Sequence, residues 1–161
     1  MSRQQYSLTL DEFRALAAEG NLIPLYREIL ADYETPVSAF AKIDHGPTAY
    51  LLESVAGGEN WARYSFLGSG SSAVIREEKG DLVVTRGKKN LRIQGRGNPL
   101  DRLRELMEAY RPVTVPGLPR FVGGAVGYFS YEMVRTFEEL PALRRDSLGM
   151  PDFAFLLTDT L

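Results

Sequence analysis

The chain has 161 residues, of which 44% are hydrophobic and 25% charged, and its formal net charge at pH 7 is -2. These values are typical of a soluble globular domain with one core, and the acidic balance argues against nucleic-acid binding, which needs a basic face. No apolar run approaches the ~20 residues of a membrane span, and the residues after Met1 do not resemble a signal peptide. The absence of cysteine excludes disulfides and thiolate chemistry, and it is typical of a cytoplasmic protein.

Three segments carry the start signals of helices. Residues Thr9–Glu12 form a capping box before an apolar helical face, and Gly20 is expected to end that helix in a left-handed conformation. Thr35–Pro36 and Asn98–Pro99 each place a capping side chain before a proline at the first helical position. The spacing therefore predicts helices that start near residues 10, 36 and 99, the last running to about Tyr110.

A near-continuous apolar run, residues 49–52, ends abruptly in Glu53 and Ser54, and a second strand-like run covers residues 63–67. The pattern predicts a hairpin with a carboxylate and a hydroxyl at one strand end, where such groups can meet a small ligand. The alternative is a hairpin whose polar ends are only solvated. In that case Glu53 and Arg63 would form a weak cross-hairpin ion pair.

Period-two alternation predicts short antiparallel strands at residues 73–77, 82–85 and 91–94, joined by turns rich in glycine. Glu77 and Glu78 follow each other along the first of these strands. Their side chains should point to opposite faces, so they cannot act as an acid–base pair.

Residues 121–141 combine a glycine-rich strand with a short helix at 131–138, whose side chains Met133, Val134 and Phe137 are expected to point inward. The glycine spacing is not that of a phosphate-binding loop, and no lysine follows it. Residues 153–161 read as a strand without a closing turn, which predicts that the sheet continues in a longer protein. The overall expectation is an α+β fold, with an antiparallel sheet, short hairpins and about four helices.

Four stretches together resemble the N-terminal region of anthranilate synthase component I. They are NLIPLYRE at residues 21–28, TPVSAFAKI at 35–43, LLES with ARYSFLG at 51–54 and 62–68, and FVGGAVGYFSYEMVRTFEELP at 121–141. The resemblance covers nearly the whole chain. It implies that residues 1–161 are a single N-terminal domain of a larger subunit.

The resemblance also implies a function. Members of this family convert chorismate to anthranilate, a carbon–oxygen lyase reaction of tryptophan biosynthesis, with Mg²⁺ held by acidic residues of a C-terminal catalytic domain. Ammonia comes from a glutamine amidotransferase subunit, component II. None of the catalytic or metal-binding motifs occurs here, so no catalytic residue, metal ligand or cofactor is assigned to the chain, which alone should be inactive.

In the family, the LLES segment forms part of the pocket for the feedback inhibitor L-tryptophan. By that likeness Ser54 is expected to bind the amino-acid group, Glu53 the α-ammonium and Leu52 the ring, with Arg63 aligned to a basic residue of the pocket. The family pocket also uses C-terminal residues, so this chain would supply half a site. The rival interpretations are aminodeoxychorismate synthase component I, a relative with the same fold, and a stand-alone, non-catalytic binding module.

Overall fold

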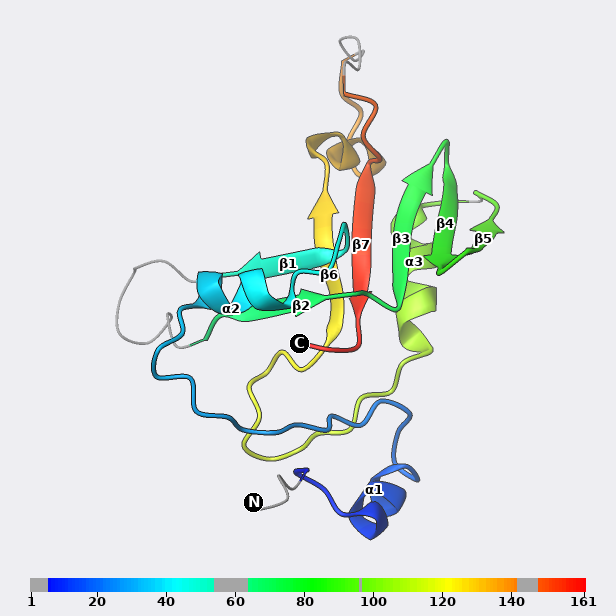
Figure 1. Ribbon diagram of the computed structural model, residues 1–161. Helices are drawn as coiled ribbons and strands as arrows, with labels where there is room; N and C mark the ends of the chain where they lie inside the picture. Colours follow the sequence, from blue (N-terminus) through cyan, green and yellow to red (C-terminus); the bar gives the residue numbers. More distant parts are fainter. Residues whose placement is uncertain (1–5, 54–63, 96, 142–147) are drawn as a thin grey trace. The chain divides into compact units, whose positions relative to one another are not determined.

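The computed structural model describes residues 6–53, 64–95, 97–141 and 148–161 (Figure 1). The chain forms two compact units, one made of residues 1–34 and 103–122, the other of residues 35–102 and 123–161. The described residues contain antiparallel sheets, three α-helices and one 3₁₀ helix, which confirms the α+β prediction.

In the first unit, helix α1 (Leu10–Leu16) begins as predicted. The Thr9 hydroxyl accepts a hydrogen bond from the Glu12 amide at 3.3 Å, and the Glu12 carboxylate accepts one from the Thr9 amide at 2.8 Å. The prediction for Gly20 is wrong, because its φ is not positive. Gly20 is needed for close approach instead: a Cβ there would overlap the Arg111 carbonyl and lie 2.7 Å from a Val113 methyl.

Asn21 ties the segment after α1 to the segment that follows helix α3 (Pro99–Glu108). Its side-chain amide donates to the Ala109 carbonyl at 2.8 Å, and its side-chain oxygen accepts from the Arg111 amide at 2.6 Å. Leu22 then forms a parallel bridge with Pro112. Two stretches far apart in the sequence are therefore joined by both backbone and side-chain hydrogen bonds.

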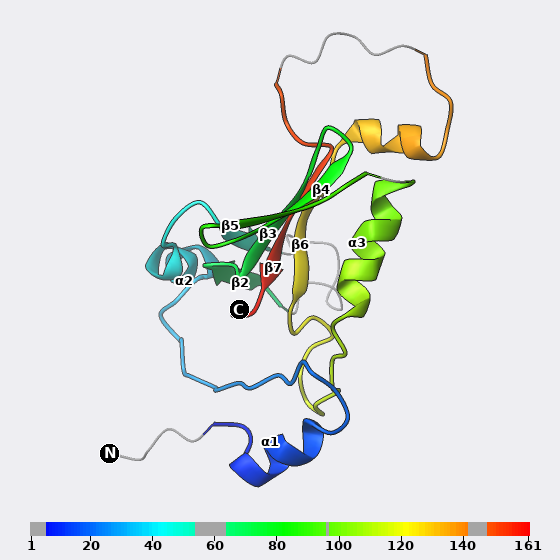
Figure 2. The same ribbon diagram turned by 90° about the vertical axis from the view of Figure 1, so that its right-hand side faces the viewer.

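The second unit is built on a five-stranded antiparallel sheet with the strand order β5-β4-β3-β7-β6 (Figures 1 and 2). The strands are β3 (Ala73–Glu78), β4 (Asp81–Arg86), β5 (Lys89–Ile93), β6 (Gly124–Phe129) and β7 (Phe153–Thr158). The three predicted hairpin strands are confirmed to within two residues at each end. The last strand of the sequence, β7, lies between β3 and β6.

Most of the core of this unit lies on one face of the central strands, and Val83 of β4 is buried on the opposite face. Ile75, Leu82 and Phe153 are fully buried. On β3, and on β7 as far as Leu157, the buried residues alternate with half-buried ones, and Ile75 stands directly opposite Phe155. Thr158 at the end of β7 is buried as well. This period of two is what a sheet with one buried face requires.

Arg102, near the start of α3, fixes the β3–β4 turn and the end of β5. Its side chain is 7% exposed, and its guanidinium donates to the carbonyls of Gly80 at 2.8 Å and Gln94 at 3.2 Å. The start of α3 is confirmed by the Asn98 side chain, which accepts from the Leu100 amide at 2.9 Å. A buried cation thus donates to one carbonyl of the β3–β4 turn and to one that directly follows β5.

Charged side chains join the three hairpin strands. Arg92 donates to Glu78 at 2.7 Å and to Asp81 at 2.8 Å, and Arg76 donates to Glu78 at 2.6 Å. The Arg76 hydrogen bond lowers the pKa of Glu78, and the Arg92 hydrogen bond lowers that of Asp81. The Glu77 carboxylate accepts from the Gly80 amide. Glu77 and Glu78 therefore act separately, as predicted.

The free energy of unfolding should fall as the pH is lowered through the range in which Glu78 and Asp81 titrate. A carboxylate whose pKa is lower in the folded state stabilises the fold above its ordinary pKa, about 4. That contribution is lost as the pH falls through the folded value. Urea denaturation between pH 6 and pH 2 measures this loss. Arg92→Gln should flatten the profile, and a profile as steep as that of the native chain would contradict the role of Arg92.

Candidate functional site

The predicted hairpin is present as a two-stranded antiparallel sheet of β1 (Ala49–Leu52) and β2 (Phe66–Ser69). The second strand starts at Phe66, three residues later than expected. Helix α2 (Pro36–Ile43) contacts both strands (Figure 1), and it begins as predicted with Thr35 at the N-cap and Pro36 at the first helical position. The Ser38 side chain completes a capping box with Thr35, which the sequence did not predict. The hairpin and α2 thus support the segment in which the candidate ligand-binding residues lie.

The C-terminal end of β1 holds two of the four candidate residues. Leu52 is the last residue of β1, lies opposite Phe66 and is 46% exposed. Glu53 follows directly and is exposed. Ser54 and Arg63 lie outside the described residues, so their assignments stay predictions from the resemblance. The strand therefore ends where the sequence predicted, at an accessible carboxylate.

Two aromatic residues that the sequence did not single out adjoin this strand end: Phe66 is the cross-strand partner of Leu52, and Tyr64 stacks on Phe66. The rings of Tyr64 and Phe66 stack with their centroids 6.1 Å apart. Residues two apart on an extended chain share a face, and cross-strand pairing puts Leu52 on the same face as Phe66. We call Leu52, Tyr64 and Phe66 the apolar platform. The Tyr-x-Phe alternation just before the glycine of β2 was the sequence signal for it.

The apolar platform and Glu53 together have the character of a site for an amphipathic molecule. Aromatic rings pack against other flat rings, and an exposed carboxylate can bind an ammonium group. His45, the single histidine, is exposed, and its backbone amide donates to the Ser69 hydroxyl at 3.0 Å. In the described part of the chain, no three His, Cys, Asp or Glu residues are grouped as a metal site would require.

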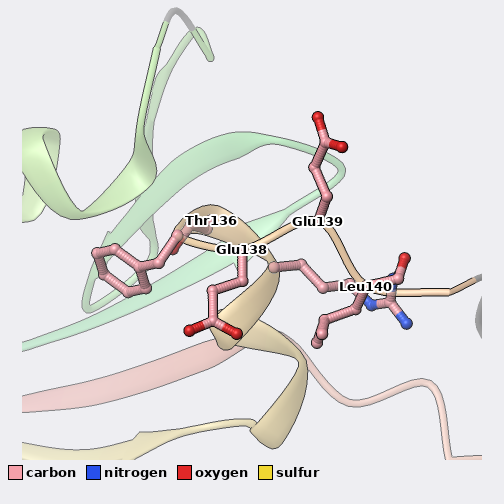
Figure 3. A pocket seen from close by; sticks show the side chains of 6 residues that line it. Thr136, Glu138, Glu139 and Leu140 are labelled. Atoms are coloured by element: carbon pink, nitrogen blue, oxygen red, sulfur yellow. The ribbon is translucent and has the colours of Figure 1, made fainter.

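A second hollow lies beside the 3₁₀ helix η1 (Tyr131–Thr136) and is lined by residues 135–140 (Figure 3). The Arg135 guanidinium organises it by donating to the carbonyls of Leu140 at 3.1 Å and Pro141 at 2.7 Å. Glu138 and Glu139 point away from each other. Arg135 therefore holds the segment that follows η1 in place.

The prediction that Phe137 points inward is wrong, since its side chain is 67% exposed. Met133 is buried and Val134 half-buried, as predicted. A 3₁₀ helix has three residues per turn, so positions four apart do not stay on one face as they do in an α-helix. The segment also leaves the helix at Thr136, one residue before Phe137.

The NLIPLYRE stretch lies in the first unit. Leu25 lines a shallow apolar groove there with Tyr6, Leu8, Thr9, Leu10 and Phe13. The Arg27 guanidinium lies 4.4 Å from the centre of the Tyr6 ring, a cation–π contact. Within the first unit, Asn21 and Arg27 hold this stretch in place. Across the described ranges, no helix has the length and apolar character needed to span a bilayer.

Comparison with known proteins identifies relatives. No family model matches the chain. It is 40% identical over 151 residues to anthranilate synthase component 1 of Acetivibrio thermocellus, 42% over 154 residues to that of Pseudomonas aeruginosa, and 40% over 158 residues to that of Aquifex aeolicus. These matches cover 94–96% of the chain but only 30–31% of each relative. The chain therefore belongs to the family of anthranilate synthase component 1, of whose members it spans about a third.

Proposed function

We propose that the chain is the N-terminal part of an anthranilate synthase component 1 subunit and contributes half of a feedback site for L-tryptophan. The relatives are about three times as long, which leaves room for a catalytic domain beyond this part. In the intact subunit that domain would convert chorismate to anthranilate and pyruvate with Mg²⁺. The ammonia would come from a glutamine amidotransferase subunit, component II, in the cytoplasm.

The observation that supports the feedback role is the set of residues at the C-terminal end of β1. An apolar platform and an exposed carboxylate adjoin there. L-tryptophan offers the complementary groups, an indole ring and an α-ammonium. A charge-assisted hydrogen bond from the ammonium to Glu53 is stronger than a neutral one. In this proposal Leu52 packs on the indole, and Ser54 and Arg63 bind from the part of the sequence between β1 and β2.

The control would be allosteric. Tryptophan bound to this part and to the catalytic domain together would favour a state that handles chorismate or ammonia poorly. Such an effect requires different affinities for two states, with a coupling of typically about 1–3 kcal/mol. Half a site would bind tryptophan weakly by itself, so the experiment needs the intact subunit.

Neutralising Glu53 should weaken inhibition of the intact subunit by L-tryptophan. Glu53→Gln keeps the shape of the side chain but removes its charge, and we expect the inhibition midpoint to rise roughly tenfold, the equivalent of about 1.4 kcal/mol. Anthranilate formation from chorismate and ammonia, followed by fluorescence over a range of tryptophan concentrations, measures this. For each variant, the rate at each tryptophan concentration is divided by the rate of the same variant without tryptophan.

Glu108→Gln is the matched control, since it removes an exposed carboxylate at the end of α3, in the other unit. Its midpoint should equal the native value. An unchanged midpoint in Glu53→Gln would refute the proposed site. Formation of aminodeoxychorismate in place of anthranilate would instead support the rival assignment to that relative, whatever the inhibition shows.

A further inference from the structure

Strand β6 lies at an edge of the five-stranded sheet. Within the described residues it pairs only with β7, whereas β7 pairs on both sides (Figure 1). The sequence predicted that the sheet continues beyond the strand at residues 153–161. Because that strand, β7, already has two neighbours, a further strand has to join at one of the two edge strands, β5 or β6.

The backbone of β6 has hydrogen-bonding groups on the side away from β7, which we call the outer edge. The Ser130 amide, directly after β6, donates to the Asp152 carbonyl at 2.7 Å and so faces the β7 side. Every second residue of an antiparallel strand bonds to the same neighbour, so the Tyr128 amide faces β7, and those of Gly127 and Phe129 face the outer edge. Gly127 has no side chain and is exposed, so its backbone itself meets water.

The two edge strands of the sheet differ in charge. β5 carries Lys89 and Arg92, and charged side chains on an edge strand discourage pairing with a further strand. β6 has the sequence Gly-Ala-Val-Gly-Tyr-Phe, without a charged residue or a proline. An uncharged edge of this kind is a template for strand pairing and promotes aggregation where it stays uncovered. The composition therefore favours β6, and not β5, as the strand that another strand covers.

The Phe129 side chain is a second indication that β6 is covered. Its ring centre lies 6.0 Å from that of Phe153 and 4.9 Å from that of Phe155, two buried residues, yet Phe129 is 51% exposed. A strand paired with the outer edge would place side chains beside this ring and remove apolar surface from water. One added strand would thus satisfy the backbone of the outer edge and complete the aromatic cluster.

We infer that the outer edge of β6 binds a strand from the remaining part of the same subunit. The inference rests on the proposed function in one respect, the existence of the longer subunit. The relatives are about three times as long as this chain, so most of their sequence lies outside it. A strand tethered in the same subunit has a high effective concentration, which favours it over a second copy or component II. Its residues on the Phe129 face should be apolar.

Amide hydrogen exchange of the intact subunit, read at single residues by mass spectrometry, tests the inference. The amides of Gly127 and Phe129 should exchange about 100-fold or more slowly than in an unstructured chain, because they donate to the added strand. The outward amides of β5 should exchange much faster. Rapid exchange at Gly127 and Phe129, or equal rates on β5 and β6, overturns the inference.

The same measurement separates the possible partners of β6. It is made without component II, at concentrations at which light scattering shows a monomer, and slow exchange under these conditions supports the inference. Slow exchange that needs component II, or that appears only at concentrations at which dimers form, overturns the inference in favour of that partner.

A photoreactive side chain identifies the segment that covers β6. Phe129→p-benzoylphenylalanine keeps an aromatic ring at an exposed position, and irradiation of the intact subunit joins that ring to its neighbours. Cross-links to residues beyond position 161 of the same subunit support the inference. Cross-links confined to residues 1–161, or formed with a second copy, overturn it. Leu91→p-benzoylphenylalanine, on β5 at a position that is 60% exposed, is the matched control, and an equal yield of cross-links beyond position 161 from both positions overturns it as well.

Neither measurement depends on chorismate or tryptophan, so the inference and the proposed function can fail separately. Rapid exchange at Gly127 and Phe129 in a subunit that forms anthranilate overturns the inference and leaves the proposed function standing. Slow exchange there, in a subunit that forms no anthranilate, contradicts the proposed function and supports the inference.

Discussion

Replacement of Gly127 by alanine is expected to separate β6 from β7 and to lower the free energy of unfolding by about 3 kcal/mol, the upper part of the usual range for overpacking. Gly127 pairs with Phe155. A Cβ at position 127 would overlap the Ala154 carbonyl and lie 2.7 Å from the Phe155 Cα. These atoms belong to the backbone of a central strand, which cannot rotate away as a side chain can.

The sign of the Gly127→Ala effect tests this account. The φ of Gly127 is not positive, so without the overlap alanine would stabilise the chain by about 0.4–1 kcal/mol through the unfolded state. Urea denaturation followed by circular dichroism gives the free energy, and amide hydrogen exchange shows whether β6 and β7 open first. Gly87→Ala is the control, at a φ of 56° with open space around it. It should cost only about 1–2 kcal/mol, and an equal or smaller cost for Gly127→Ala would contradict the overlap.

Phe153→Ala should cost about 3–5 kcal/mol, the usual range for removal of a buried phenylalanine. Phe153 is fully buried at the start of β7, and its ring centre lies 6.0 Å from those of Phe129 and Phe155. Removal of the ring would leave a cavity and end two aromatic contacts.

Phe129→Ala is the matched control for Phe153→Ala, since it removes the same group from the same cluster at a position that is 51% exposed. Urea denaturation should show that Phe129→Ala lowers the free energy of unfolding by less than half as much as Phe153→Ala, because much of the Phe129 ring is already exposed to water. Similar losses for the two variants would show that burial does not set the stability of this cluster. Phe153→Leu should recover most of the loss if the cavity is its main cause.

Much of the local structure could be predicted because its causes lie within a few residues. The capping side chains at Thr9, Thr35 and Asn98 each start a helix by bonding to an amide two or three positions later. The hairpin of β3 and β4 follows from the turn at Lys79 and Gly80, both with positive φ. Signals of this kind need no knowledge of the rest of the fold.

The errors arise where partners are far apart in the sequence. Gly20 was expected to end a helix, but its size serves the approach of Arg111, which no local pattern indicates. Phe137 was placed inward on the assumption of an α-helix, and the tighter 3₁₀ geometry turned it outward. In the candidate site, the position of Leu52 and Glu53 at the strand end could be predicted. The cross-strand partner Phe66, on whose ring Tyr64 stacks, could not be assigned to the site, because the register of β1 and β2 was unknown.

The place of β7 in the sheet affects the order in which the protein can fold during synthesis. Strands β3, β4 and β5 can pair as soon as they leave the ribosome, because short turns connect them. The other neighbour of β3 is β7, which is synthesised much later. The Ser72 hydroxyl, for example, donates to the Leu157 carbonyl, 85 residues further along the sequence. Until β7 leaves the ribosome, one edge of β3 has unpaired backbone groups, and β6 lacks the strand with which it pairs. This interval is when aggregation is most probable and when a chaperone would have the most to protect.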